Sequence, residues 1–269
     1  MKNIILILVV CILTSCTGWQ KSQDIKKSVG PARIQTAPEQ IRLDAVPELD
    51  AKKMTIAVYN FLDKTGQRKP ADKIANLSSA VTQGSEVWVI KALQEVGNGT
   101  WFEVVERVGM EHLIKERQLI RNTRDTYEKE KPHGPTALKP MLFAGLLLEG
   151  GIVGYDSNVS TGGVGARYLG LGLQDEYRID YVTVVMRIVS VSTGRVLFSV
   201  ATEKTIASYR SGTDVFKFFD MGTKAVESEI GWSINEPVNY AVRAAIEAGV
   251  VEMVYEGERK GLWKFKEFR

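Results

Sequence analysis

Cysteine and histidine are scarce in this chain, which has two of each among 269 residues. An excess of either charge is also missing, because 35 Lys and Arg residues stand against 32 Asp and Glu residues. This balance disfavours a nucleic-acid partner, since phosphate binding requires a basic excess or a basic stripe. Hydrophobic residues make up 44% of the chain, which excludes disordered and collagen-like classes. The sequence is therefore long and apolar enough for one or two domains with a core.

Both cysteines, Cys11 and Cys16, lie close to the start of the chain. The apolar run 4–13 follows a positively charged start and is too short to span a bilayer. It leads into Leu-Thr-Ser-Cys at 13–16, which is typical of a bacterial lipoprotein signal, although an ordinary secretory peptide would also explain the run. We expect residues 1–15 to be a signal peptide and Cys16 to carry covalent diacylglycerol and an N-acyl lipid. With Cys11 removed, no disulfide can form.

The residues after the cysteine predict a location and a tether. Thr17 stands where an inner-membrane retention signal would usually carry Asp, so the cell outer membrane is the expected address. Residues 16–52 are polar, show no sustained periodicity and are expected to form a lipidated N-terminal arm. A disordered tether and an ordered strap around a neighbour are both compatible with this composition.

Residues 53–263 predict a periplasmic α+β domain, with a C-terminal tail at 264–269. Strand-like and helical patterns alternate irregularly, which favours helices packed on a mainly antiparallel sheet. Strands are expected at 54–61, 102–106, 146–154, 181–189 and 195–201. Helices are expected at 81–96, 110–120, 136–144 and 237–254. Gly97 is expected to cap the first of these helices, and Gly194 to supply a positive φ in a hairpin turn.

Two stretches interrupt this domain, one between Gly154 and about Tyr181, the other between Ala201 and Pro237. In both, charged residues and not only neutral polar ones occupy every second position. A strand of about ten residues with one apolar face, one charged face and aromatic ends is typical of a membrane barrel wall. Four such strands cannot close a barrel, so several chains would have to share one. The alternative is a pair of amphipathic hairpins lying on a soluble domain.

The alternation also predicts which residues face water and which face lipid. Lumen-facing barrel positions would be Arg167, Arg178, Asp180, Lys217, Glu227 and Glu229. Lipid-facing or interfacial positions would be Tyr168, Tyr177, Ile179, Phe216, Phe218, Ile230 and Trp232. The pattern is imperfect, because the run 169–173 shifts phase and Asp214 has the parity of Phe216 and Phe218.

Several motifs occur in a fixed order along the chain. They are Gly-Tyr-Asp-Ser-Asn-Val-Ser-Thr-Gly-Gly-Val-Gly-Ala-Arg-Tyr at 154–168, Ile-Val-Ser-Val-Ser-Thr-Gly at 188–194, Asn-Glu-Pro-Val at 235–238, Ala-Ile-Glu-Ala-Gly at 245–249 and Gly-Leu-Trp at 261–263. Together they closely resemble the curli secretion channel lipoprotein family, CsgG, from the signal to about residue 263. The resemblance implies a ring of about nine copies, each giving hairpins near 159–179 and 209–233 to one shared transmembrane β-barrel.

By this resemblance, the ring would export unfolded curli-type amyloid subunits as an ATP-independent diffusion channel, helped by periplasmic and surface accessory proteins. The family has a lumenal constriction on the loop after the first strand, built from a tyrosine, an asparagine and a phenylalanine. Asn76 matches the asparagine, Leu77 stands in place of the phenylalanine, and no tyrosine precedes them after Pro70. Leu77 is expected to form an apolar collar, with a buried loop anchor as the alternative.

An enzyme is disfavoured, because the chain lacks the phosphate-loop, zinc-protease and nucleophile-elbow motifs. His112 and His133 are expected to be packing or solvent-facing residues, and Glu227 with Glu229 fits a wet lumen lining. No cofactor and no metal is expected. The remaining alternative is a non-pore envelope lipoprotein of similar periplasmic fold that binds another envelope protein.

Overall fold

The computed structural model describes residues 34–67, 81–124, 138–162, 175–211, 216–220 and 237–267. Its sheet has six strands in the order β2-β1-β3-β4-β5-β6. The strands are β1 (Met54–Asp63), β2 (Phe102–Val105), β3 (Leu146–Gly162), β4 (Asp175–Ser190), β5 (Val196–Ser211) and β6 (Phe216–Asp220). The helices are α2 (Gln40–Asp44), α3 (Ser85–Gly99), α4 (Met110–Thr123) and α5 (Pro237–Arg259). All of these elements belong to one compact unit.

The sheet is mixed, whereas the sequence predicted a mainly antiparallel one. β1 pairs in parallel with both β2 and β3, and the pairs β3–β4, β4–β5 and β5–β6 are antiparallel. The parallel pairs arise because α3 connects β1 to β2, and a crossover helix returns the chain in the same direction. Ile56, Ala57 and Val58 are consecutive and all buried, as expected for a strand covered on both edges and faces.

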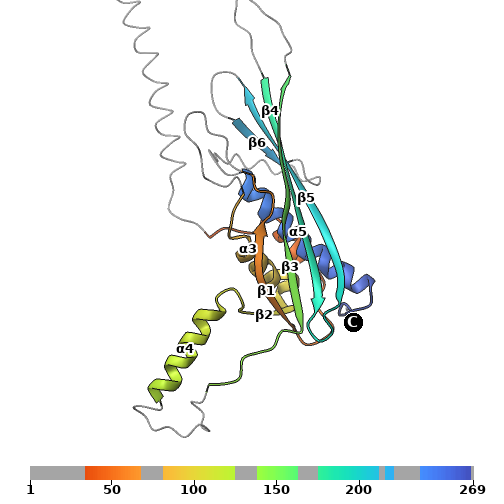
Figure 1. The fold of residues 1–269 in the computed structure, drawn as a ribbon. Helices are drawn as coiled ribbons and strands as arrows, with labels where there is room; N and C mark the ends of the chain where they lie inside the picture. Colours follow the sequence, from red (N-terminus) through yellow and green to blue (C-terminus); the bar gives the residue numbers. More distant parts are fainter. Residues whose placement is uncertain are drawn as a thin grey trace, which may run out of the picture. The chain divides into compact units, whose positions relative to one another are not determined.

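Figure 1 shows the helices α3 and α5 beside the sheet, with β3, β4 and β5 running far beyond them. The buried residues of β4 are alternate ones, Val182, Val184, Met186 and Ile188, so one face of this strand is the core face. The helix α5 packs on that face, and the hydroxyl of Thr202 in β5 donates to the carbonyl of Ala245 at 2.8 Å. The predicted hairpin turn is confirmed, with Gly194 at φ +67°.

The helices α4 and α5 begin where the sequence predicted, at Met110 and Pro237, and both end later than predicted, at Thr123 and Arg259. Helical backbone in α3 ends before Val96, and Gly97 has φ +57°, so the predicted C-cap is confirmed. The helix begins at Ser85, four residues later than expected. The helix predicted at 136–144 is wrong over the described residues 138–144, which have no regular structure. Pro140 lies in the middle of that segment and lacks the N–H that a helix interior requires.

The ends of the described chain pack on the domain. In the predicted arm, Ala37, Leu43, Val46 and Leu49 are all buried, and we name residues 37–50 the strap. Leu49 forms a β-bridge with Phe265, which the sequence assigned to the C-terminal tail. The domain therefore includes residues of the predicted arm from Ala37 onward and residues of the predicted tail at least to Phe265. The strap shows that a segment can pack on a domain through a few apolar residues between prolines, even when its sequence has no helical or strand periodicity.

Candidate functional site at the junction of the sheet and its hairpins

The sheet narrows where β1 ends. The last β1–β3 pair is Asp63 with Ile152, and within the described residues β3 pairs only with β4 from Gly154 to Gly162. Beyond this level the sheet consists of the outer parts of β3, β4 and β5 together with β6. We call the level of Asp63 and Ile152 the junction.

A β-bulge marks the junction in β3. The β3–β4 register shifts between Ile152 and Gly154, and Val153 is 46% exposed while Ile152 and Tyr155 are both buried. The extra residue reverses which positions of β3 face the core. Tyr155, at an odd-numbered position, therefore continues the core face that Leu148 and Ile152 form at even-numbered positions.

The connection between β1 and α3, residues 64–84, also begins and ends at the junction. The amide of Lys64 donates to the carbonyl of Ile152 at 2.9 Å, and Val81 is 1% exposed. Both ends of the connection are thus fixed to the folded domain. The predicted constriction residues Asn76 and Leu77 lie between these ends and outside the described residues.

A layer of buried polar side chains lies on the core face just beyond the junction. The Tyr155 hydroxyl donates to Asp180 Oδ1 at 3.4 Å, and both side chains are buried. Lys204, paired across β4–β5 with Val182, is also buried, and its Nζ lies 4.0 Å from Glu39 Oε1 of the strap. The sequence assigned Asp180 to a water-filled lumen; in the single chain its side chain is fully enclosed beside Tyr155.

A buried ion pair within α5 accepts a hydrogen bond from the strap. Arg243 Nε donates to Glu247 Oε1 at 2.7 Å, and the Glu39 amide donates to Glu247 Oε2 at 2.9 Å. The Arg243 guanidinium lies 4.4 Å from the ring centroid of Trp88. Burial raises the pKa of Glu247 above 4.5, although the Glu39 amide and Arg243 act in the opposite direction. Sequence reasoning missed this pair, although two charges at i and i+4 in a largely apolar helix were the signal.

The hairpin residues predicted to face lipid or lumen are placed by strand register where they are described. Across β4–β5, Tyr177 pairs with Tyr209 and Arg178 with Ser208. Across β5–β6, Tyr209 pairs with Lys217, so the register sets Lys217 in one row with Tyr177. The sequence alternation put these two residues on opposite faces. By the same register, Phe216 and Phe218 pair with Arg210 and Ser208, and Ile179 pairs with Ala207.

The other residues singled out in the sequence lie outside the described residues. They are Cys16, Asn76, Leu77, Arg167, Tyr168, Glu227, Glu229, Ile230 and Trp232. His112 is described and is exposed on α4, whereas His133 is not described.

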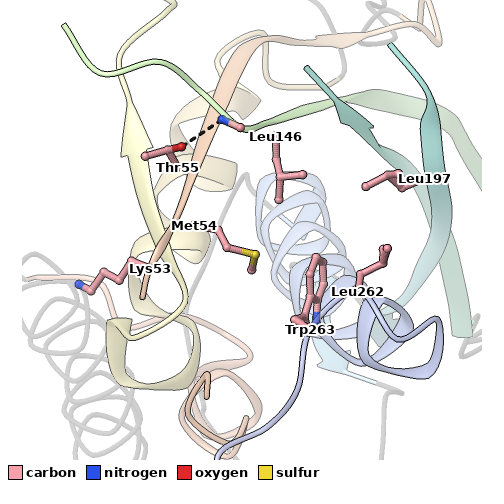
Figure 2. A pocket seen from close by; sticks show the side chains of 8 residues that line it. Lys53, Met54, Thr55, Leu146, Leu197, Leu262 and Trp263 are labelled. Atoms are coloured by element: carbon pink, nitrogen blue, oxygen red, sulfur yellow. Dashed lines mark hydrogen bonds between the residues drawn. The ribbon is translucent and has the colours of Figure 1, made fainter. Parts of the chain in front are cut away.

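A pocket lies where β1 and β3 begin, at the other end of these strands from the junction. Figure 2 shows Met54, Leu146, Leu197, Leu262 and Trp263 around it, with Lys53 to one side. The Gly145 amide donates to Thr55 Oγ1 at 3.0 Å and joins the starts of the two strands. Most of the side chains around this pocket are hydrophobic, so the pocket would favour an apolar group.

Two findings concern the described residues as a whole. No group of three or more His, Cys, Asp or Glu residues among them is arranged to hold a metal ion. None of the described helices combines the length and apolarity needed to cross a bilayer.

Comparisons with known proteins place the chain in a family. Residues 36–268 match the family model for the curli production assembly/transport component CsgG. Proteins described by that same name, from Citrobacter koseri and from Escherichia coli (strain K12), are each 36% identical to this chain over 263 residues. Those alignments cover 98% of this chain and 91% of each relative.

Solved structures give more distant likenesses. The PelC dodecamer from Paraburkholderia phytofirmans is 13% identical to this chain and has a TM-score of 0.27. The aligned region covers 78% of this chain and 92% of the PelC chain. Protein XCC0632 from Xanthomonas campestris is 12% identical, covers 81% of this chain and 95% of its own, and has a TM-score of 0.31. On the family match and the 36% identity, this chain belongs to the family of the curli production assembly/transport component CsgG.

Proposed function

We propose that this protein is the subunit of an outer-membrane secretion channel. Several copies, nine by the family resemblance, form a ring in which each chain contributes two hairpins to one transmembrane β-barrel. The channel lets unfolded curli-type amyloid subunits diffuse outward without ATP, and periplasmic and surface accessory proteins assist it. The membership in a curli transport family supports the cargo and the process.

The observation that carries this proposal is the pair of open edges beyond the junction. Within the described residues, β3 has no partner on its β1 side from Gly154 onward, and β6 is the last strand on the other side. A row of unpaired amide and carbonyl groups cannot remain exposed in a bilayer. Pairing β3 of one copy with β6 of the next would cover both edges at once, and repetition around a ring would close the barrel.

Strand direction supports the same pairing. The four strands β3, β4, β5 and β6 alternate in direction, because each neighbouring pair is antiparallel. With an even number of strands in each chain, β6 of one copy runs antiparallel to β3 of the next. The alternation of bacterial barrels is thus preserved across every contact between chains.

The lipid anchor and the constriction complete the proposal. Acylated Cys16 would hold the protein at the outer membrane, since several acyl chains together anchor firmly. The connection between β1 and α3 starts and ends at the junction, where β1 leaves the sheet. Asn76 and Leu77 would therefore line the passage between a periplasmic vestibule and the barrel.

The proposal is tested on full-length lipidated protein extracted from membranes in detergent. Electron microscopy should show rings, and planar bilayers should show discrete conductance steps. Deleting 209–233 should leave a folded lipoprotein that forms neither. Conducting rings from the deletion variant would refute the barrel assignment, and a non-conducting wild-type monomer would favour an envelope lipoprotein that binds a partner.

A substitution at Leu77 tests the constriction separately. Replacing Leu77 with Ser or Ala removes most of an apolar side chain from each copy, so the opening should widen and single-channel conductance should rise. Rings of normal size with unchanged conductance would place Leu77 outside the lumen.

A further inference from the structure

Exposed hydrophobic side chains gather at the end of the sheet where β1 and β3 begin. Phe143, two residues before the pocket residue Gly145, is 89% exposed. The Gly145 carbonyl accepts from the amide of Val191, another exposed apolar residue, at 3.1 Å. Leu262 lines the pocket itself and is also exposed. Because neighbouring exposed apolar groups mark interaction surfaces, this end of the domain is suited to contact another molecule.

The pocket at this end is held open by the backbone and has a volume of about 430 Å³. Leu197 is the extra residue of a β-bulge, since Val196 pairs with Val189 and Phe198 pairs with Ile188. The bulge lets Leu197 line the pocket while the neighbouring Phe198 stays in the core. The pocket is therefore a built feature of the fold, with room for one bulky apolar side chain.

Cations lie at the edge of the pocket. Lys53 lines it, Lys264 follows the pocket residue Trp263, and Arg195 lies two residues before Leu197. All three cations are exposed. Their side chains form no ion pair with any other residue that the structure describes. Their charges are therefore available to a ligand that brings carboxylates.

Acidic residues near the pocket are fewer. Glu103 of β2 pairs in register with Thr55, and the Asp50 amide donates to the Lys264 carbonyl at 3.0 Å. Lys52 adds one more exposed cation to the same region. The charge around the pocket is thus positive on balance, so this surface attracts an acidic ligand and repels a basic one.

We propose that this pocket is a docking site for an acidic segment of another protein that carries one large apolar side chain. That side chain enters the pocket and contacts Leu197, Leu262 and Trp263, while flanking Asp or Glu residues meet the cations at the edge. Burial of the apolar group supplies most of the binding free energy, and the charges select the partner. The inference goes beyond the proposed function, because it concerns recognition at the end of the strands opposite to the junction.

The test uses short fluorescein-labelled peptides and the full-length lipidated protein in detergent. One peptide has a central tryptophan flanked by Asp and Glu residues. A second peptide replaces the tryptophan with alanine, and a third replaces the acids with Asn and Gln. Fluorescence polarisation measures the affinity of each peptide. The acidic tryptophan peptide should bind at least about ten times more tightly than either of the other two.

Two variants alter the pocket, and each has a matched control on α4. Lys53→Glu reverses a charge at the edge of the pocket, and Lys115→Glu makes the same change at an exposed position of α4. Leu262→Ser removes an apolar contact, and Leu119→Ser makes the same change at an exposed leucine of α4. The pocket variants should bind the acidic tryptophan peptide about five times more weakly than the wild type, and the controls should bind it equally well.

Equal binding of the three peptides, or wild-type affinity in both pocket variants, would overturn the proposal. Melting temperatures show whether each variant is folded, and Lys53→Glu alone decides the outcome where Leu262→Ser lowers the melting temperature. Loss of self-association in Leu262→Ser, measured by light scattering, would identify a second copy of the chain as the occupant and would also overturn the proposal. None of these measurements uses conduction, so failure of the docking site is distinguished from failure of the proposed channel.

Discussion

At the scale of single residues, a glycine in α5 lies beneath an indole ring. A Cβ atom at Gly257 would come within 2.5 Å of three atoms of the Trp263 ring. The Trp263 Nε1 group donates to the Val254 carbonyl at 2.8 Å, so the ring cannot move aside freely. Trp263 also packs edge-on against Trp101 and Phe198. A larger residue at Gly257 would therefore disturb the whole aromatic cluster.

Gly257→Ala separates helix propensity from packing. Alanine in a helix interior is favoured over glycine by about 1 kcal/mol, so propensity alone predicts stabilisation. We expect the steric conflict with Trp263 to dominate and to lower the free energy of unfolding by about 1–3 kcal/mol, measured by denaturant titration. Gly194→Ala is the control, because a Cβ there meets nothing within 4 Å and only its φ of +67° opposes the change. Stabilisation by Gly257→Ala would contradict the packing described for Trp263.

The raised pKa of Glu247 makes a prediction about pH. Since the folded-state pKa lies above the unfolded value near 4.5, Glu247 contributes most to stability below 4.5 and loses that contribution as pH rises through the folded pKa. The wild type should therefore gain free energy of unfolding relative to Glu247→Gln when pH falls from 7 to 5, in denaturant titrations at both values.

Glu256 supplies the control of opposite sign. Hydrogen bonds from Arg259 and Lys260 lower the pKa of Glu256, so its contribution is present above 4.5 and is lost as pH falls through the folded value. The stability difference between wild type and Glu256→Gln should shrink on acidification. If both stability differences changed in the same direction with pH, burial would not be the main cause of the raised pKa of Glu247.

At the scale of elements, the strap behaves as part of the core. Leu43 is fully buried, whereas Ile41, two residues before it on α2, is 78% exposed. Leu43→Ala should lower the free energy of unfolding by about 2–5 kcal/mol, and Ile41→Ala should change it by less than about 0.5 kcal/mol. Equal effects of the two variants would mean that the strap does not dock as described.

The same elements show what the sequence could predict. The strand at β1, the Gly97 cap, the Gly194 turn and the helix α5 followed from periodicity and from glycine or proline placement, which are local signals. The parallel β1–β2 pair follows from the strand–helix–strand order that the sequence predicted at 54–106, whereas the pairing of β1 with β3 depends on which segments meet in space. The helix expected at 136–144 does not form over the described residues 138–144, because Pro140 lacks the N–H that a helix interior requires.

The candidate site was predictable to a smaller extent. Charged alternation indicated the hairpins, and Tyr177 and Arg178 do lie in one long strand with a partner on each side. The sequence does not encode the register of β6 relative to β5. A shift of one residue in that register would move every side chain of β6 to the opposite face of the sheet. The Asp63–Gln83 and Glu39–Glu247 contacts join residues far apart in sequence, so only the fold could reveal them.

At the scale of the whole molecule, the proposed lipid anchor on Cys16 can be tested by itself. Cys16→Ser should abolish labelling by radioactive palmitate and should move the protein from the membrane fraction to the soluble periplasmic extract. The domain itself should keep its melting temperature, because every described core residue lies beyond position 36. Palmitate labelling of the serine variant would exclude Cys16 as the modified residue.

The unbroken course of β3, β4 and β5 through the junction has a mechanical consequence. These strands leave the helix-covered part of the sheet without any intervening loop, and their ladders continue across the bulge. A force along the strands would load the ladder hydrogen bonds in shear, so that many bonds would have to break together. In the proposed channel, tension from a polypeptide caught in transit would therefore be distributed over the whole length of the ladder, from Leu146 at one end to Gly162 at the other.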